Sequence, residues 1–192
     1  MNISRIICNK EIIEWGKEMS ILKLILPTAK YKDEIMNYKR EFIKNNESMD
    51  GTSGLRNAKS FEEWHKAILD NLNEETVREG LVPASTYIAI STDDERLIGM
   101  IDIRHRLNEY LLNYGGHIGY SVRRLERGKG YATEMLKLAL EECERLGLER
   151  VLITCDKDNI ASAKTIIKNG ASLENEVQEE SGITQRYWIN FN

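Results

Sequence analysis

The sequence predicts a single α/β domain, of the α+β kind, with a mixed central β-sheet flanked by helices. The chain of 192 residues is long enough for one domain with a substantial core. Short apolar runs typical of strands alternate with segments whose apolar residues recur at helical spacing. The sequence contains no internal repeat, low-complexity tract or linker, so we expect these elements to share one sheet.

The first half of this domain is expected to begin with one strand and two helices. An apolar run over residues 21–28 predicts a strand near the start of the sheet. Helical spacing of apolar residues predicts a helix over 31–43. Residues 45–59 are polar and contain glycine, so they predict a long loop, and such loops are often functional. Ser60 and Glu63 form a capping box that begins the second helix.

The middle of the chain predicts three antiparallel strands. Residues 85–91 and 96–107 alternate as strands do, and the turn "TDDE" between them makes a hairpin. A short helical or looped crossover follows and ends at the glycine pair 115–116. The chain then enters a strand over 117–123, which runs directly into a turn rich in basic residues and glycine.

The last third predicts the remaining helices and strands. A long helix with a broad apolar face follows the basic turn and ends at Gly147. The continuous apolar run 150–156 is typical of a strand buried on both faces. Another helix is expected to begin at Asp158 or Asn159, and residues 184–191 supply a final strand.

Composition limits the kinds of partner. A formal net charge of -4 argues against general nucleic-acid binding. The cysteines, Cys8, Cys143 and Cys155, are odd in number and widely spaced, which predicts neither a disulfide framework nor a zinc site. The sequence lacks an apolar run of the roughly 20 residues needed to cross a bilayer, and its N-terminus lacks the pattern of a signal peptide. We therefore expect a cytoplasmic protein without nucleic-acid, membrane or metal partners.

The first eighteen residues form a separate problem because their periodicity is mixed. We treat 1–18 as an N-terminal extension and 19–192 as the folded domain. Met19 stands directly before the first clear strand pattern, and the tetrapeptide Trp15 to Glu18 back-translates to a purine-rich stretch like a bacterial ribosome-binding site. One hypothesis is that native translation starts at Met19; the alternative is an ordinary short N-terminal helix.

The basic turn has the chemistry of an anion site. Where a strand runs into a helix, the first backbone N–H groups lack partners within the helix and carry the positive end of its dipole. Gly128 and Gly130 remove side chains that would keep an anion away from those amides, and Arg127 and Lys129 add full charges. This combination suits a pyrophosphate, whereas a solvated basic turn that only caps the helix is the alternative.

Two common nucleotide motifs do not fit this turn. The ATP/GTP P-loop requires a Gly-Lys-Ser/Thr ending at a fixed distance from its first glycine, and "GKGYAT" lacks it. A dinucleotide fingerprint requires a third small residue at the position that Thr133 occupies in this chain. It also requires an acidic residue at the end of the next strand, which this chain lacks at the expected distance.

The hexapeptide from Arg127 to Ala132, "RGKGYA", resembles the Arg/Gln-x-x-Gly-x-Gly/Ala signature of the GNAT superfamily of N-acetyltransferases. Asn159 and Ser162 match the Asn-x-x-Ala/Ser opening of the second cofactor-contacting helix in that family, and Gly170 stands where the family has a glycine before the next strand. The resemblance covers residues 21–191. More narrowly, "GGHIGY", "RGKGYA" and "CDKDN" resemble motifs of a subgroup of bacterial predicted acetyltransferases.

The resemblance implies acetyl-CoA as co-substrate and transfer of its acetyl group to a primary amine of a small molecule or peptide by direct attack. It implies a pyrophosphate on the amides of residues 127–132 and a pantetheine arm added like a short strand along Val122. The implied cofactor-binding residues are Tyr120, Ser121, Val122, Arg127, Gly128, Lys129, Gly130, Tyr131, Ala132, Thr133, Asn159 and Ser162. The alternatives are a non-catalytic acyl-CoA sensor and, more weakly supported, a nucleic-acid adaptor. Either a monomer or a homodimer is expected.

The chain departs from the family pattern at the general acid. The family often uses a tyrosine seven residues after the asparagine to protonate the departing thiolate, and here that position is Ile166. Another tyrosine, Tyr120, Tyr131 or Tyr187, or water would have to replace it.

The general base must also be sought outside the motifs. His117 is the leading candidate, because the ordinary pKa of histidine suits proton removal near neutral pH, and the alternative is a structural histidine. His105, Asp102 and Glu109 are weaker candidates. The loop 45–59 is either an acceptor lid, with Glu47 and Asp50 attracting an amine, or an ordinary solvated loop. The remaining large aromatic residues are expected in the core: Trp64, Tyr87 and Trp188.

Overall fold

The computed structural model describes residues 6–8, 11–13, 20–180 and 182–191. Seven strands form one sheet in the order β3-β4-β5-β6-β7-β9-β8, in which only the β6–β7 pair is parallel. The strands are β3 (Leu22–Ile25), β4 (Ala84–Ser91), β5 (Leu97–Arg104), β6 (Ile118–Val122), β7 (Arg150–Asp156), β8 (Ser172–Glu179) and β9 (Gly182–Asn190). The prediction of a single domain with a mixed sheet is confirmed.

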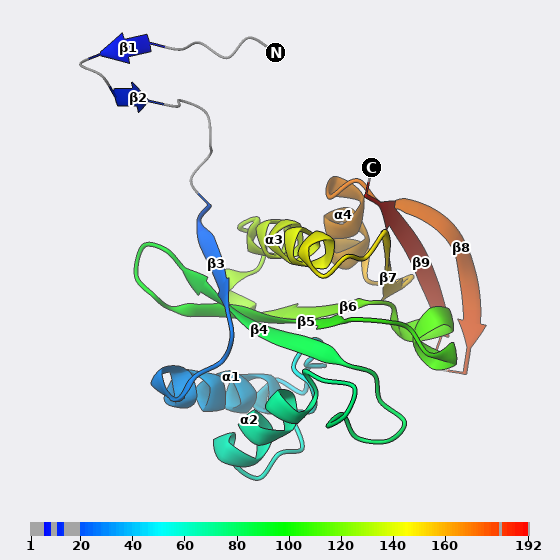
Figure 1. The fold of residues 1–192 in the computed structure, drawn as a ribbon. Helices are drawn as coiled ribbons and strands as arrows, with labels where there is room; N and C mark the ends of the chain where they lie inside the picture. The colour runs from blue at the N-terminus through cyan, green and yellow to red at the C-terminus, as the bar shows by residue number, and fades with distance from the viewer. Residues whose placement is uncertain (1–5, 9–10, 14–19, 181, 192) are drawn as a thin grey trace.

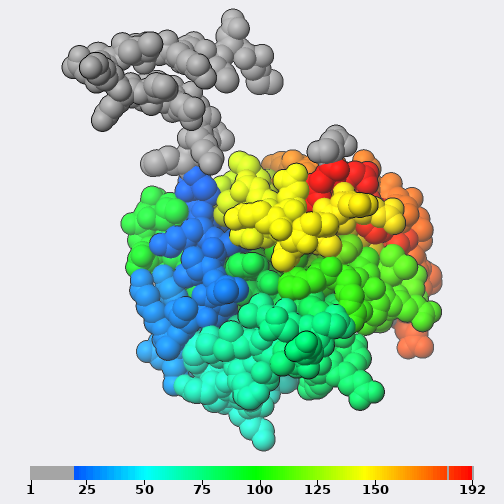
Figure 2. Space-filling view, in the orientation of Figure 1, coloured from blue at the N-terminus to red at the C-terminus, as the bar shows by residue number. Residues whose placement is uncertain are grey.

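Helices cover both faces of this sheet (Figure 1). A short 3-10 turn (Ala29–Tyr31) leads into α1 (Lys32–Lys44), and α1 lies with α2 (Phe61–Asp70) on one face. The other face carries α3 (Tyr131–Arg145) and α4 (Ile160–Lys168). The space-filling view shows the green strands enclosed between the blue and teal helices below and the yellow α3 above (Figure 2). None of the helices in the described ranges is long and apolar enough to cross a membrane.

Each layer has its own apolar core. Met135, Leu136 and Ala139 of α3 are fully buried against the sheet, together with Ile166 of α4. On the opposite face, α1 and α2 bury a cluster that includes Trp64, which is 1% exposed. These layers fix both faces of the central strands, so the loops at the strand ends are held in place.

Near the N-terminus, Ile6–Cys8 (β1) and Glu11–Ile13 (β2) pair as antiparallel strands. The alternative of a short helix there is therefore wrong for these residues. Met19 and the tetrapeptide before it lie outside the described residues, so the hypothesis about the translation start stays a prediction.

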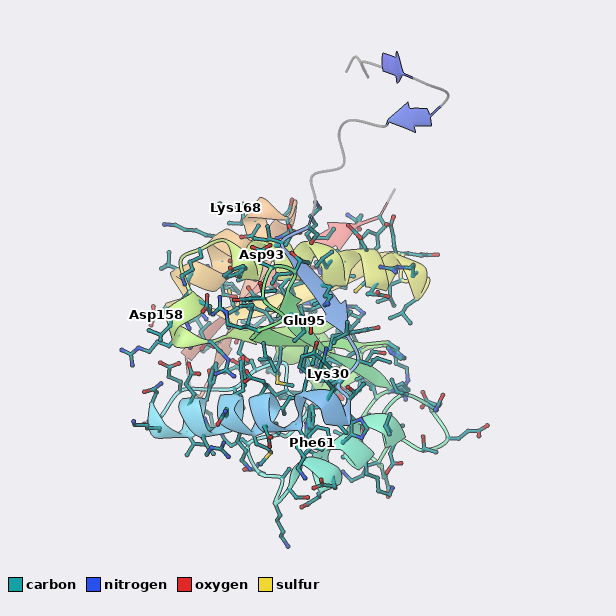
Figure 3. The ribbon with its side chains drawn as sticks, turned by 90° about the vertical axis from the view of Figure 1, so that its left-hand side faces the viewer. Lys30, Phe61, Asp93, Glu95, Asp158 and Lys168 are labelled. Carbon is teal, nitrogen blue, oxygen red and sulfur yellow. The ribbon has the colours of Figure 1, made fainter. Side chains whose placement is uncertain are left out.

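The predicted capping box of α2 is present in a shifted form. The Oγ of Ser60 accepts a hydrogen bond from the Glu63 amide at 3.2 Å, as predicted. The Glu63 carboxylate, however, accepts from the amide of Lys59 at 2.9 Å. Helix α2 consequently begins at Phe61, the residue labelled at its start in Figure 3.

The segment 45–59 is irregular, as predicted, but it is not an ordinary solvated loop. Met49 and Leu55 are buried in the core below the sheet, and the indole N–H of Trp64 donates to the carbonyl of Thr52 at 2.8 Å. Gly51 lies so close to β6 that a Cβ atom there would be 2.2 Å from the carbonyl oxygen of Gly119. Its φ of +71° also favours glycine. The loop is therefore fixed against the centre of the sheet.

Strands β6 and β7 diverge. They share a single register pair, Ile118 with Ile153, whereas β7 and β9 pair along their whole length. Beyond Ile118, no strand in the described part of the chain pairs with the side of β6 that faces β7. A helical crossover that ends in the π-helix Leu111–Gly115 leads into β6. The predicted connection therefore takes its helical form.

Candidate active site

A cleft of about 1030 Å³ opens where β6 and β7 diverge. It is bounded by the two strands, the basic turn, the first turns of α3 and α4, and the loop 45–59. Most predicted cofactor-binding residues line it: Tyr120, Ser121, Val122, Arg127, Gly128, Gly130, Ala132, Thr133, Asn159 and Ser162. Lys129 and Tyr131 do not line the cleft, because the ammonium of Lys129 turns to a carboxylate and Tyr131 packs against the core. The fold thus brings together two segments that are distant in the sequence.

The basic turn has unused amide donors beside the cleft. Helix α3 begins at Tyr131 with Gly130 as its N-cap, and no side chain caps it. Gly128 and Gly130 have φ values of +75° and +88°, a conformation that glycine adopts without strain. Within residues 20–180 and 182–191, no oxygen accepts a hydrogen bond from the amides of Gly128, Lys129 and Gly130. Three donors at the positive end of a helix dipole form a site for an anion.

The cations of this turn are already paired with carboxylates. Arg127 donates through Nε to the carbonyl of Val122 at 2.9 Å and through Nη2 to the carboxylate of Glu47. That hydrogen bond from Arg127 is the main reason why the pKa of Glu47 is lowered. Arg124 also lies 3.8 Å from Glu47. The loop 45–59 is therefore tied to the basic turn by an ionic contact that sequence reasoning did not predict.

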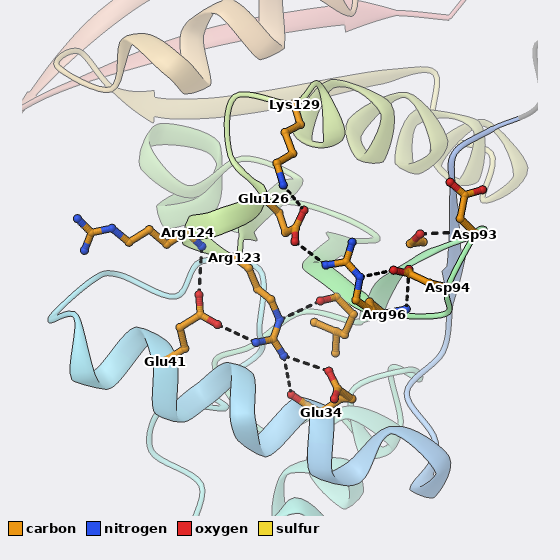
Figure 4. A network of polar contacts seen from close by, with 11 residues as sticks. Glu34, Glu41, Asp93, Asp94, Arg96, Arg123, Arg124, Glu126 and Lys129 are labelled. Carbon is orange, nitrogen blue, oxygen red and sulfur yellow. Dashed lines mark hydrogen bonds and ion pairs between the residues drawn. The ribbon is translucent and has the colours of Figure 1, made fainter.

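Glu126 anchors the turn from below (Figure 4). Its carboxylate accepts from Arg96 at 2.6 Å and from Lys129 at 3.0 Å, although the residue is only 6% exposed. Burial acts to raise the pKa of Glu126, but the hydrogen bonds from Lys129 and Arg96 outweigh it and the pKa is lowered. Glu126 lies within the basic run of the sequence, so the sequence shows its negative charge, but it does not show that the residue is buried.

Arg123, at the end of β6, points away from the cleft. Its guanidinium donates to the Glu41 carboxylate at 2.7 Å and to Glu34 on α1, as Figure 4 shows. It therefore fastens the turn to α1 and is not available to a ligand or to nucleic acid in this arrangement.

The second half of the cleft is built on α4. Asn159 caps this helix by accepting from the Ser162 amide at 3.1 Å, as the sequence predicted for the helix start. The Oγ of Ser162 is 2.7 Å from the hydroxyl of Tyr120 on β6. Asp158 precedes this helix and Lys168 is its last residue, so their labels in Figure 3 locate its two ends.

Tyr120 on β6 and Cys155 on β7 both line the cleft between these strands. Burial raises the pKa of the Tyr120 phenol to about 12, and burial raises the pKa of the Cys155 thiol to about 11. Both groups are therefore neutral at pH 7. Ile166, at the position of the family's tyrosine, is fully buried in the core and does not line the cleft.

His117 is held by the sheet and does not line the cleft. Its Nδ1 accepts from the Leu152 amide at 2.9 Å, its ring lies edge-on to Trp188, and it is 6% exposed. Burial is the main cause that lowers its pKa to about 4. These surroundings do not support its predicted role as a base, because the nitrogen that would take the proton already accepts a hydrogen bond.

The weaker base candidates are also occupied by structural contacts. His105 is 2.8 Å from the hydroxyl of Ser85, and burial lowers its pKa. The buried Asp102 accepts from Ser53 and Thr86, and Glu109 is exposed outside the cleft.

Of the aromatic residues expected in the core, Trp64 is buried, whereas Tyr87 and Trp188 are only partly buried. Among the described residues, no group of three or more His, Cys, Asp or Glu side chains is arranged to hold a metal ion.

Solved structures similar to this chain include acetyltransferases. RimL, a ribosomal L7/L12 alpha-N-protein acetyltransferase in complex with coenzyme A, is 18% identical with a TM-score of 0.65, covering 89% of this chain and 94% of its own. A microcin C7 self-immunity acetyltransferase in complex with acetyl-CoA and AMP is 21% identical, with a TM-score of 0.58 and coverage of 88% and 92%. A spermidine N-acetyltransferase chimera that includes the Vibrio cholerae enzyme is 17% identical, with a TM-score of 0.60 and coverage of 89% and 96%.

The sequence comparisons give the family directly. A search of curated protein sequences found no match. The model of the acetyltransferase (GNAT) domain, however, matches residues 23–172, which include the basic turn, the splayed strands and α4. The chain belongs to the GNAT acetyltransferase family.

Proposed function

We propose that the cleft between β6 and β7 is the active site in which this GNAT acetyltransferase moves an acetyl group from acetyl-CoA to a primary amine. The observation that carries the proposal is the turn at residues 127–132, whose free amides end at the mouth of a cleft between diverging strands. A pyrophosphate needs such donors, and a thioester arm needs an open strand edge beside them.

The residues present fit coenzyme A. The amides of Gly128, Lys129 and Gly130 would hold the pyrophosphate, and Arg127 would add charge once it shares its guanidinium with the ligand. The pantetheine amides would add to the open edge of β6, as a peptide adds to a sheet. When bound, acetyl-CoA supplies the activated acyl group; the remaining chemistry belongs to the chain and the acceptor.

The transfer requires a neutral amine and a proton for the leaving thiolate. The amine nitrogen forms a bond to the thioester carbon, the C–S bond breaks, and backbone N–H groups of β6 stabilise the oxyanion. We assign the proton donation to Tyr120, because its phenol lines the cleft and stays protonated at neutral pH. The three histidines lie outside the cleft lining, whereas the carboxylates of Asp50, Asp156 and Glu179 line it. We assign the proton of the amine to water in the open cleft, from which it can pass to one of these carboxylates.

The acceptor is either a small amine or a peptide amine. Structures of this fold bear names that cover both, a ribosomal-protein alpha-N-acetyltransferase and a spermidine N-acetyltransferase. A cytoplasmic location and a monomeric or dimeric state remain part of the proposal. So does the absence of nucleic-acid partners, which the net charge of -4 supports.

The test has two readouts. Thermal unfolding with coenzyme A, at several concentrations, is expected to show stabilisation that grows with ligand. Release of free thiol from acetyl-CoA is then followed over polyamines, aminoglycosides, amino acids and peptides. Stabilisation with no thiol release for any acceptor would favour the acyl-CoA sensor, and no stabilisation would remove the cofactor assignment altogether.

A further inference from the structure

Arg104, the last residue of β5, places its guanidinium over the start of β6. Gly119 leaves room for it, since a Cβ at that position would lie 3.4 Å from both terminal guanidinium nitrogens. Its Nη1 donates to the carbonyls of Gly115 at 3.2 Å and Gly116 at 3.4 Å. Its Nε lies 3.5 Å from a carboxylate oxygen of Asp102. These contacts fix the plane of the guanidinium before any ligand arrives.

One side of this guanidinium remains available. Arg104 lines the cleft, and no oxygen in the described part of the chain accepts a hydrogen bond from its Nη2. Asp102 does not use this donor, because its Oδ1 accepts from Ser53 at 2.7 Å and from Thr86 at 2.8 Å, and its Oδ2 lies beside Nε. A fixed cation with a free donor therefore forms part of the cleft wall.

The position of Arg104 separates it from the cofactor phosphates. The basic turn follows the end of β6 at Val122, whereas Arg104 lies at the other end of that strand, beside Gly119. If the phosphates lie on the turn and the pantetheine follows β6, the acetyl group comes to the end where Arg104 stands. A cation there faces the acceptor and not the cofactor.

We propose that Arg104 binds a carboxylate of the acceptor, so that the substrate class is a primary amine that also carries a carboxylate; this rests on the proposed function. A guanidinium matches a carboxylate in shape, and such charge-assisted hydrogen bonds are among the stronger ones. Tyr110, Leu111 and Tyr114 line the same cleft and offer aromatic and apolar contact to the rest of the acceptor. A polyamine has no carboxylate and therefore lacks the group that Arg104 would bind.

The experiment compares acceptors that differ in one carboxylate, with each kcat/KM expressed per neutral amine, because the amide also lowers the pKa of the reacting amine. Thiol release from acetyl-CoA is measured with phenylalanine against phenylalaninamide, and with the peptide amides Ser-Asp against Ser-Asn. The first pair tests an α-carboxylate and the second an acidic side chain near a peptide N-terminus. We expect one acid to exceed its amide in kcat/KM by about tenfold to a hundredfold, the usual range for a hydrogen bond to a charged group. Equal use of acid and amide in both pairs, or better use of spermidine, would overturn the proposal.

Variants assign the effect to this side chain. Arg104→Gln is expected to remove the preference for the acid while coenzyme A still stabilises the protein, and Arg104→Lys is expected to restore part of it. Arg106→Gln is the matched control, because Arg106 pairs with Glu74 at the surface outside the cleft. An equal loss for acid and amide in Arg104→Gln, with thermal stability kept, would contradict the role.

A failure of the proposed function is distinguishable from a failure of this inference. If coenzyme A binds but no acceptor releases thiol, the enzyme assignment fails. Calorimetric titration of the same acids and amides into the protein saturated with coenzyme A then tests Arg104 directly. Equal affinities of acid and amide would reject it, and a preference for the acid lost in Arg104→Gln would support it.

Discussion

The two ends of β6 differ in how their polar groups are used. Beyond Val122 the chain turns through Gly128, Lys129 and Gly130, whose amides have no acceptor in the described part of the chain. At the start of the strand, the His117 amide donates to the Leu152 carbonyl, and the His117 carbonyl accepts from the backbone amide of Arg104. The Nδ1 of His117 accepts from the Leu152 amide. The unpaired amides after Val122 can bind a ligand. His117, whose acceptor nitrogen already accepts a hydrogen bond, stabilises the fold instead. The following predictions test this difference, from the largest expected effect to the smallest.

Tyr120→Phe tests the chemistry in the middle of the strand. Losing the phenol proton should lower kcat by about a hundredfold, the lower end for general acid catalysis, and leave the KM for acetyl-CoA nearly unchanged. Tyr187→Phe is the control, because its hydroxyl binds Gln185 and does not line the cleft. An unchanged kcat in Tyr120→Phe would mean that water protonates the thiolate.

His117→Phe tests the start of β6 as structure. The Leu152 amide loses its acceptor, so the free energy of unfolding at pH 7 should fall by about 1 to 3 kcal/mol in chemical denaturation. In the native chain the pKa of His117 is about 4, below its ordinary value of 6.5, so the unfolded state binds the extra proton. The wild type should therefore lose stability as pH falls from about 6.5 to 4, and this part of the loss should vanish in the variant.

The same variant has a kinetic readout. If His117 is not the base, the rise of kcat/KM with pH should follow the ionisation of the acceptor amine in both proteins. A pH profile that loses an inflection near 4 in His117→Phe, while the variant stays folded, would restore the histidine as a base.

Gly130→Ala tests the end of β6. A side chain at φ +88° costs about 1 to 2 kcal/mol of stability, and its Cβ would enter the open space next to the free amides. We expect the Kd for coenzyme A to rise about tenfold, as one unfavourable contact of this size implies. Gly147→Ala, at the other end of α3 with φ +78°, should lose similar stability and keep its affinity. Equal affinities in the two variants would remove the turn from the binding site.

Glu47→Gln tests the ionic contact over the turn. The carboxylate competes with an incoming phosphate for Arg127, so its removal should tighten coenzyme A binding by about two- to threefold, typical for a partly exposed pair. The gain should shrink at high salt because such pairs are screened. Glu62→Gln is the control, since Glu62 pairs with Lys32 at the surface outside the cleft. Weaker binding in Glu47→Gln would indicate that this residue positions Arg127 for the ligand.

Local patterns predicted the fold and the turn well. The cap of α4 by Asn159 and the glycines before α3 depend on neighbours within one turn of the chain, so the sequence displays them directly. Long-range contacts were beyond such reasoning. The partner of His117 lies 35 residues away, and Glu47 meets Arg127 only after the whole first half has folded. For this reason the sequence left His117 open between a base and a structural residue, and the loop 45–59 open between an acceptor lid and a solvated loop.

The close approach of Gly51 to Gly119 has a consequence for redesign. The same fifteen-residue stretch packs on the central strand, lines the cleft and pairs with an arginine of the basic turn. If this stretch were grafted from a relative to change the accepted amine, the affinity for coenzyme A should change at the same time. Any exchange has to keep glycine at position 51, opposite Gly119 of β6, and an acid opposite the basic turn, or the transplanted segment will not pack against the sheet.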